Sequence, residues 1–302
     1  LAATATLGET LADLRGLRGT GAVGKSARLF GILAAHFMES EAAVAEGLQA
    51  ANDLRLSAEA RRLLFDALCA CGRAEAERAV AQVAGSGRSS EEARSAAVRA
   101  LARTAIPSDE TVGTLLEALG EPGPLGLDAA FALGRLADGS SGVAGRAEVG
   151  AALVAALRVR RNEERVIVLE ALAHEGDPGT VAAICDALGD PAESVRAAAA
   201  HALRGFSDPD SARVLVDLVH FATSPRVRAA AVEAAVNRSD PGVTEALAMR
   251  VISDPVPEIR WTALLGLAGR MRIDPAARAA VESAALASPS EAIREAAARF
   301  LR

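Results

Sequence analysis

Aromatic and lysine residues are scarce in this chain of 302 residues. It has no tyrosine, one tryptophan and seven phenylalanines, and Lys25 is its only lysine against 32 arginines. The near-complete preference for arginine indicates a GC-rich bacterial genome. The formal net charge is −6 and the pI is about 5.4. Because a nucleic-acid-binding domain usually carries a basic patch and a high pI, this charge argues against nucleic acid as the partner.

Cysteine is also rare, and long apolar runs are missing. Cys69, Cys71 and Cys185 are too few for a disulfide framework, so we expect a reducing, cytoplasmic compartment. No run approaches the ~18 apolar residues of a membrane helix, which predicts no direct membrane insertion. The chain begins at Leu1 rather than Met, so the sequence leaves open whether a leader was removed or a longer protein was cut.

One pattern is repeated throughout the second half of the chain. Four short pairs recur every 32 to 34 residues, each at the start of an alanine-rich run: Val195-Arg196, Val227-Arg228, Ile259-Arg260 and Ile293-Arg294. Within a run the apolar residues are spaced by three and four, which is typical of one face of a helix. The small alanines let neighbouring helices approach closely.

A second helix is predicted ahead of each run, and Asp-Pro pairs mark where it begins. Asp is a good N-cap because its carboxylate accepts hydrogen bonds from the free N–H groups of the first turn, and Pro suits the first helical position. The pairs are Asp177-Pro178, Asp208-Pro209, Asp240-Pro241 and Asp274-Pro275. Each repeat is therefore a helical hairpin, which must stack on its neighbours to bury its apolar face.

The alanine-rich run resembles the second helix of HEAT repeats, in the short bacterial form related to phycobilisome-lyase repeats. Val195 to Leu203 and Ile259 to Leu267 match that helix closely. The resemblance implies an all-α fold, a right-handed α-α superhelix of about nine hairpins. It also implies that the recurring arginine ties the second helix to the acids of a turn, as Arg196 would to Asp190 and Arg260 to Asp254.

Nine repeats fit the whole chain when each is aligned on a leucine or alanine near the end of its second helix. Seven of the nine then carry arginine at one position, and we call these seven the arginine column: Arg61, Arg94, Arg165, Arg196, Arg228, Arg260 and Arg294. We therefore predict a single solenoid over residues 1–302, with a degenerate first repeat over 1–38. A Gly/Ser-rich insertion over 138–150 separates the fourth and fifth repeats, as a hinge or as a tolerated loop.

One short segment matches the P-loop pattern of nucleotide-binding proteins, with Gly19, Gly24, Lys25 and Ser26 at the defining positions. A P-loop needs a buried strand before it and a parallel sheet around it. The preceding segment is charged and helix-like, so we interpret the glycines as a turn between two helices rather than as a nucleotide site. His174-Glu175 resembles the iron-binding pairs of deoxyhypusine hydroxylase, but a single pair is insufficient, and we interpret it as polar residues of a turn.

The second helices are expected to line the concave side of such a solenoid. Positions on this helix that lie off the packing stripe give a candidate binding surface for a protein partner. It contains two apolar pairs, each four residues apart, among charged residues, which favours a protein ligand. The candidate residues are Arg99, Leu127, Phe131, Glu170, His201, Glu233, Trp261, Leu265 and Arg299.

The sequence therefore favours a non-catalytic protein-interaction scaffold within a larger complex, with no cofactor, no metal and no catalytic residue. The alternative is an enzyme or enzyme subunit similar to the HEAT-like bilin lyases or DNA glycosylases. A pocket floored by an acid or metal cluster would favour the enzyme, and a broad groove of mixed charge would favour the scaffold.

Overall fold

The structure, a computed structural model, describes residues 5–17, 23–51, 53, 56–138, 145–240 and 242–302. The described residues form eighteen α-helices and no β-strand, as the repeat pattern predicts. The chain divides into two compact units, unit 1 over residues 1–156 and unit 2 over residues 157–302. We describe each unit by itself, and the single solenoid over residues 1–302 stays a prediction.

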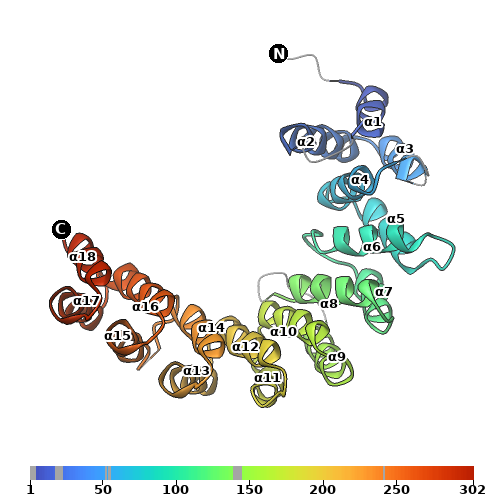
Figure 1. The fold of residues 1–302 in the computed structure, drawn as a ribbon. Coiled ribbons are helices and arrows are strands. Elements are labelled where there is room, and N and C mark those ends of the chain that lie inside the picture. Colours follow the sequence, from blue (N-terminus) through green and yellow to red (C-terminus); the bar gives the residue numbers. More distant parts are fainter. Residues whose placement is uncertain (1–4, 18–22, 52, 54–55, 139–144, 241) are drawn as a thin grey trace. The chain divides into compact units, whose positions relative to one another are not determined.

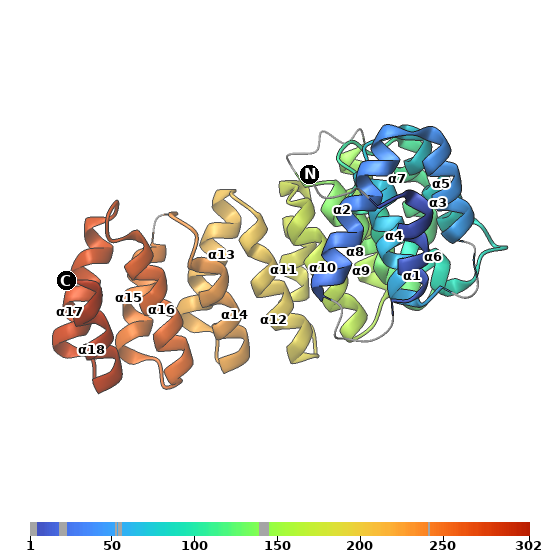
Figure 2. The same cartoon turned by 90° about the horizontal axis from the view of Figure 1, so that it is seen from above.

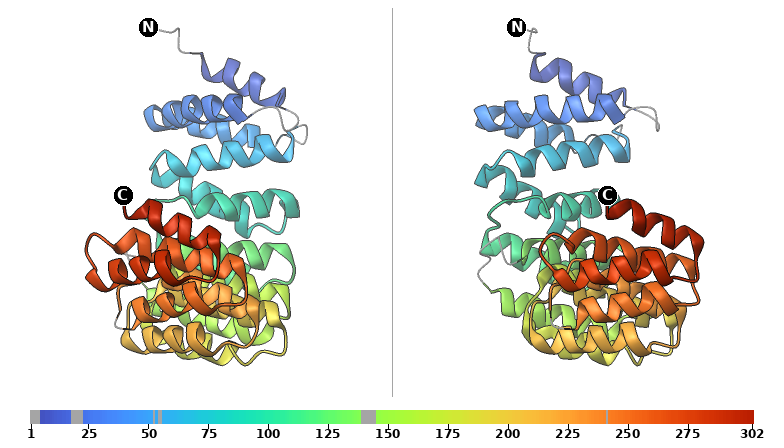
Figure 3. Two further views of the ribbon diagram at one scale, coloured as in Figure 1. Left: turned by 60° about the vertical axis from the view of Figure 1, so that its left-hand side comes forward. Right: turned by 90° about the vertical axis from the view of Figure 1, so that its left-hand side faces the viewer.

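Unit 1 is built from four helical hairpins and most of a ninth helix. In Figure 1 its even-numbered helices form one row and its odd-numbered helices the other, and Figure 3 shows them stacked one above the next. The helices are α1 (Leu7–Arg15), α2 (Val23–Glu39), α3 (Glu41–Ala51), α4 (Ala58–Ala70), α5 (Ala74–Gly85), α6 (Glu91–Leu101), α7 (Asp109–Leu119), α8 (Pro124–Leu136) and α9 (Arg146–Val159).

Unit 2 contains the remaining helices, and its own even-numbered and odd-numbered helices form two rows. Figure 2 shows the hairpins from α11 to α18 side by side. The helices are α10 (Glu163–Glu175), α11 (Val181–Ala187), α12 (Glu193–Ala202), α13 (Pro209–Phe221), α14 (Pro225–Ala235), α15 (Val243–Ser253), α16 (Pro257–Arg270), α17 (Pro275–Ala287) and α18 (Glu291–Phe300), with the 3₁₀ turns η1 (Pro178–Thr180) and η2 (Leu203–Gly205).

The boundaries of these helices follow three of the predicted Asp-Pro caps, and one predicted boundary is corrected. Asp177, Asp208 and Asp274 each accept a backbone N–H bond of 2.9 Å at the start of η1, α13 and α17, and a proline follows each. The Asp240-Pro241 pair includes Pro241, which lies outside the described residues. The insertion predicted over 138–150 is helical from Arg146 onward, because this segment forms the first turn of α9.

Small residues fill the space between neighbouring even-numbered helices. In α12 the buried residues are one valine and four alanines, Val195, Ala197, Ala199, Ala200 and Ala202. The approach is closest at Gly205, where an added Cβ would lie 1.9 Å from the carbonyl oxygen of Ala173 in α10. A side chain at this position would push the two helices apart, so glycine is required there.

Most arginines of the column connect their even-numbered helix to the end of the odd-numbered helix before it, or to the turn that follows that helix. A helix leaves its last carbonyls without partners, and a cationic donor satisfies them well. The guanidinium of Arg94 donates to the carbonyl of Ala84 at 2.9 Å, that of Arg228 to Ala222 at 2.8 Å, and that of Arg294 to Ser288 at 2.7 Å. Each of these bonds closes one hairpin across its turn.

The acids of the turns pair differently from the expectation. Arg196 donates to the backbone carbonyl of Asp190 at 2.8 Å, and Arg260 to that of Asp254 at 2.6 Å, so neither pairs with the carboxylate of its own turn. Arg165 of the preceding repeat holds the Asp190 carboxylate. A carboxylate in a turn therefore joins two repeats, while the arginine of the same repeat closes the hairpin through the backbone.

Arg228 and Asp254 form the most buried of these links, with a contact of 2.6 Å between Nε and Oδ2. Burial by itself would raise the pKa of Asp254. Hydrogen bonds from Arg228, the backbone of Val256 and Arg250 outweigh burial, so the pKa of this carboxyl lies below its usual range. A charge pair taken out of water is destabilising when one partner is lost, since the other remains buried and unpaired.

Replacing Asp254 by asparagine should therefore lower the free energy of unfolding by about 3 kcal/mol, within the range for breaking a buried pair. The matched control is Asp217→Asn on the exposed side of α13, which should cost less than about 0.5 kcal/mol. Urea denaturation followed by circular dichroism measures both. Equal stabilities of the two variants would show that the link between the repeats contributes nothing.

Candidate partner-binding surface

The even-numbered helices expose one face in each unit, which we call the even-helix face of that unit. Every residue predicted for partner binding lies there and is exposed or half-buried. Arg99, Leu127 and Phe131 belong to unit 1, on α6 and α8. The other six belong to unit 2: Glu170, His201, Glu233, Trp261, Leu265 and Arg299.

An apolar pair stands on the even-helix face of unit 2. Trp261 and Leu265 are one helical turn apart on α16, and they are 43% and 44% exposed. The core side of the same helix is occupied by Ile259, Ala263 and Leu264, all buried. The exposed pair therefore adds little to the packing of α16. Beside it, a small cavity of about 90 Å³ between α14 and α16 is lined partly by Glu233.

A charged cluster lies further along the same face, where α10 meets α12 and η2. The carboxylate of Glu170 is in contact with the Arg204 guanidinium, and its oxygens lie 3.4 Å from His174 Nε2 and 3.8 Å from His201 Nδ1. The neighbouring His201 and the Arg204 guanidinium, against the opposing effect of partial burial, lower the pKa of Glu170 to about 2. The cluster presents a carboxylate that is held beside the Arg204 guanidinium.

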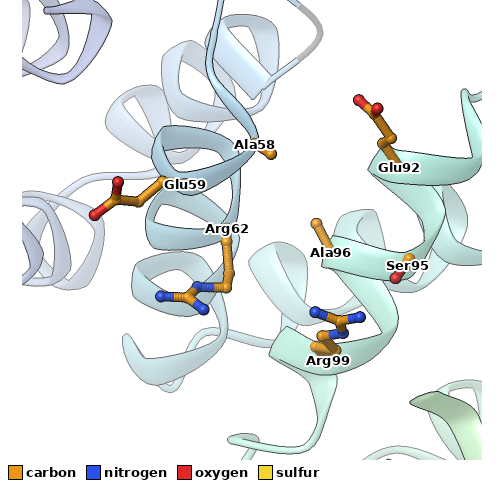
Figure 4. A pocket seen from close by; sticks show the side chains of 7 residues that line it. All are labelled: Ala58, Glu59, Arg62, Glu92, Ser95, Ala96 and Arg99. Carbon is orange, nitrogen blue, oxygen red and sulfur yellow. The ribbon is translucent and has the colours of Figure 1, made fainter. Parts of the chain in front are cut away.

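The even-helix face of unit 1 is hollowed by two neighbouring pockets. The first, of about 740 Å³ between α4 and α6, is lined by Ala58, Glu59, Arg62, Glu92, Ser95, Ala96 and Arg99, which Figure 4 shows. The second, of about 540 Å³, also reaches α8 and shares Arg62 and Arg99 with the first. Phe131, 41% exposed, lines the second pocket, so this part of the predicted surface is a groove of mixed charge.

The structure describes only the second part of the P-loop-like segment. Gly19 is outside the described residues, whereas Gly24, Lys25 and Ser26 lie in the first turn of α2. Lys25 is exposed, and the Ser26 hydroxyl donates to Glu59 of α4 at 3.3 Å. The surroundings are helical, since the part of the chain that the structure describes has no strand to support a P-loop.

The His174-Glu175 pair ends α10 instead of lying in the turn, which corrects the sequence interpretation. Glu175 is fully buried, and its carboxylate accepts the backbone N–H of Asp177 at 3.0 Å. Its role is to hold the turn that starts η1. Within the described ranges, no group of three or more His, Cys, Asp or Glu side chains is placed to hold a metal ion.

Sequence reasoning missed the residues that complete both charged sites. His174 and Arg204 join Glu170 and His201 in unit 2, and Arg103 and Arg135 line the groove in unit 1. The spacing of 34 residues between Glu170 and Arg204 is one repeat, so pairing along the column was a usable signal.

None of the helices that the structure describes is long and apolar enough to cross a membrane.

Comparison with known proteins gives a family match over the second half of the chain. A family model for HEAT repeats matches residues 150–236 and 219–302, which together make up just over half of the sequence. A search of curated proteins by sequence gives no match. The matched residues include all the hairpins from α11 to α18, whose arginine column first suggested the repeat.

Several solved structures share the fold at low sequence identity. Lipovitellin superposes with a TM-score of 0.58 and 17% identity, over 97% of this chain and 34% of its own. YibA of Escherichia coli gives 0.52 and 14%, over 94% and 98%. The complex of CpcE and CpcF of the Nostoc phycocyanin lyase gives 0.41 and 20%, over 52% and 99%. At such identities the first two likenesses establish the fold, and none of the three establishes an activity.

The charge of Glu170 should make the free energy of unfolding depend on pH. The pKa of Glu170 is about 2 in the folded chain, below the value of about 4.3 in the unfolded chain. The ionised side chain therefore stabilises the fold at pH values above about 4.3, and this contribution is lost as the pH falls toward about 2. We expect the wild type to exceed Glu170→Gln in stability at neutral pH, and the difference to vanish between about pH 4 and pH 2. Denaturation curves over this range measure it, and a difference independent of pH would contradict the pairing.

Proposed function

Because the chain belongs to the HEAT-repeat family, we propose that it is a non-catalytic scaffold that binds a protein partner on its even-helix faces. The observation that carries this proposal is the exposed pair of Trp261 and Leu265 on α16. Tryptophan is the residue type most enriched among those that dominate binding energy at protein interfaces. Trp261 is the single tryptophan of this chain, and its side chain is 43% exposed on the even-helix face of unit 2.

Packing does not require a large side chain at this position. The equivalent residues of other repeats are small or charged: Ala197 is buried on α12, Ala229 is half-buried on α14, and Glu295 is exposed on α18. A column that accepts both alanine and a charge does not require apolar volume. Exposing indole and leucine to water is unfavourable, so their presence supports a partner that covers them.

The surrounding side chains favour a protein over a nucleic acid. Glu233 lies on the neighbouring helix, and Arg299 on the other side pairs with Glu295 at 3.6 Å. An apolar centre with a rim of both charges is the usual composition of a protein interface. A phosphate backbone would instead be repelled by the acids of this rim and by the net charge of −6.

Trp261→Ala tests this proposal directly. The substitution should weaken binding of the partner at least roughly tenfold, because such anchors typically cost 2 kcal/mol or more. It should lower the free energy of unfolding by less than about 1.5 kcal/mol, below the 3–5 kcal/mol of a buried tryptophan. The control is Leu286→Ala on α17, a residue that is 84% exposed on an odd-numbered helix.

The measurement has two steps. The three immobilised chains are incubated in parallel with extract of the source organism, and bound proteins are compared by quantitative mass spectrometry. The partner retained by the wild type and by Leu286→Ala is then titrated against each purified chain. Unchanged affinity of Trp261→Ala, or a loss of stability as large as that of a core residue, would contradict the proposal.

A further inference from the structure

Four arginines converge in the second pocket of unit 1, which we call the four-arginine pocket. Arg62 comes from α4, Arg99 from α6, Arg103 from the turn after α6, and Arg135 from the end of α8. The pocket has a volume of about 540 Å³ and is also lined by Asp66, Ala102, Asp128 and Phe131. That space accommodates one or two side chains of another molecule.

Two of the four guanidinium groups are already held by carboxylates. Arg99 Nε lies 2.8 Å from Asp128 Oδ1, and Arg103 Nε lies 3.3 Å from Asp66 Oδ1. The side chains of Asp128 and Asp66 are largely buried, at 17% and 13% exposed, so they restrict the positions of the two arginine side chains. The two pairs therefore preorganise one side of the pocket.

The other two guanidinium groups form no close ion pair. Arg62 and Arg135 are exposed, and neither takes part in an ion pair among the described residues, although the charge of Arg62 acts on Asp66 from a longer distance. The pocket thus carries two arginines in excess of its acids, in a chain whose net charge is −6. Unpaired guanidinium forks beside a partly exposed phenyl ring are suited to a carboxylate that neighbours an apolar side chain.

We propose that the four-arginine pocket binds an acidic segment of a protein partner, with carboxylates on Arg62 and Arg135 and an adjacent apolar side chain against Phe131. The inference rests on the proposed function and specifies the chemistry of the partner at unit 1. The residues of the four-arginine pocket differ from Trp261 and Leu265, so an experiment can contradict this inference without contradicting the proposed function.

The adjoining pocket favours a peptide over a nucleic acid. Figure 4 shows Glu92 pointing away from Arg62 and Arg99, and Glu59 turned toward α2, where it accepts the bond from Ser26. These two acids extend the groove with negative charge. A phosphate backbone carries closely spaced charges along its length and would meet them, whereas a peptide can place its carboxylates over the arginines alone.

The test uses a short fluorescein-labelled peptide in which glutamate alternates with leucine, and the same peptide with glutamine in place of glutamate. Fluorescence anisotropy should show saturable binding of the acidic peptide and at least roughly tenfold weaker binding of the glutamine peptide, since hydrogen bonds to charged groups contribute this much. The double variant Arg62→Gln/Arg135→Gln should lose a similar factor, and Arg62→Lys/Arg135→Lys should retain part of the affinity.

The control is Arg213→Gln/Arg278→Gln, which removes two exposed arginines from the odd-numbered helices α13 and α17 and the same total charge. It should bind the acidic peptide as the wild type does, as should Trp261→Ala. Melting curves by circular dichroism confirm that each variant is folded. Absence of saturable binding, equal binding of the glutamine peptide, or an equal loss in the control would overturn the proposal. Tighter binding of a labelled oligothymidylate, lost in the Arg62→Gln/Arg135→Gln variant, would assign the pocket to nucleic acid and overturn it too.

Discussion

The bond from a column arginine to a carbonyl at the end of the preceding helix, or in the turn after it, is the interaction on which most hairpins of the arginine column depend. The last carbonyls of a helix have no partner within the helix. When that end is buried, each carbonyl without a donor is destabilising and offsets part of the free energy of packing. Arg94, Arg228 and Arg294 supply these donors at 2.7–2.9 Å, from one position of the repeat. A planar guanidinium with five donors can bond a carbonyl and a carboxylate at once in a fixed geometry, which the flexible ammonium of a lysine does not impose.

A second set of arginines repeats this solution at the ends of the even-numbered helices. Arg238 donates to the carbonyl of Leu203 at 3.0 Å, and Arg270 donates to that of Ala235 at 3.1 Å, in each case one repeat earlier. Since the structural arginines point into turns and between repeats, the even-helix face is left to other residues. Trp261 in unit 2 and Arg62 in unit 1 are exposed there without a structural role that the packing explains.

The repeat could be predicted from the sequence because its physics is local. Asp208 followed by proline, and Val195 followed by arginine, report a cap and a helix face within a few residues. Exposure of Trp261 was also predictable, because its column contains alanine and glutamate. The partners of Asp190 and Asp254 were not, since each carboxylate is held by an arginine some 25 residues earlier, and only the stacking of hairpins decides which arginine is near. The four-arginine pocket joins three helices and has no local signal for the same reason.

The most direct test of the arginine-to-carbonyl account is the stability of Arg196→Met beside that of Arg226→Met. Arg196 bonds the carbonyls of Asp190 and Pro191 at 2.8 and 2.9 Å, and methionine keeps its stem while removing every donor. Arg226, two residues before the column position on α14, is exposed. The account predicts a loss of roughly 1–3 kcal/mol for Arg196→Met, from carbonyls left unsatisfied, and under about 0.5 kcal/mol for Arg226→Met. Equal, small losses in both variants would contradict it.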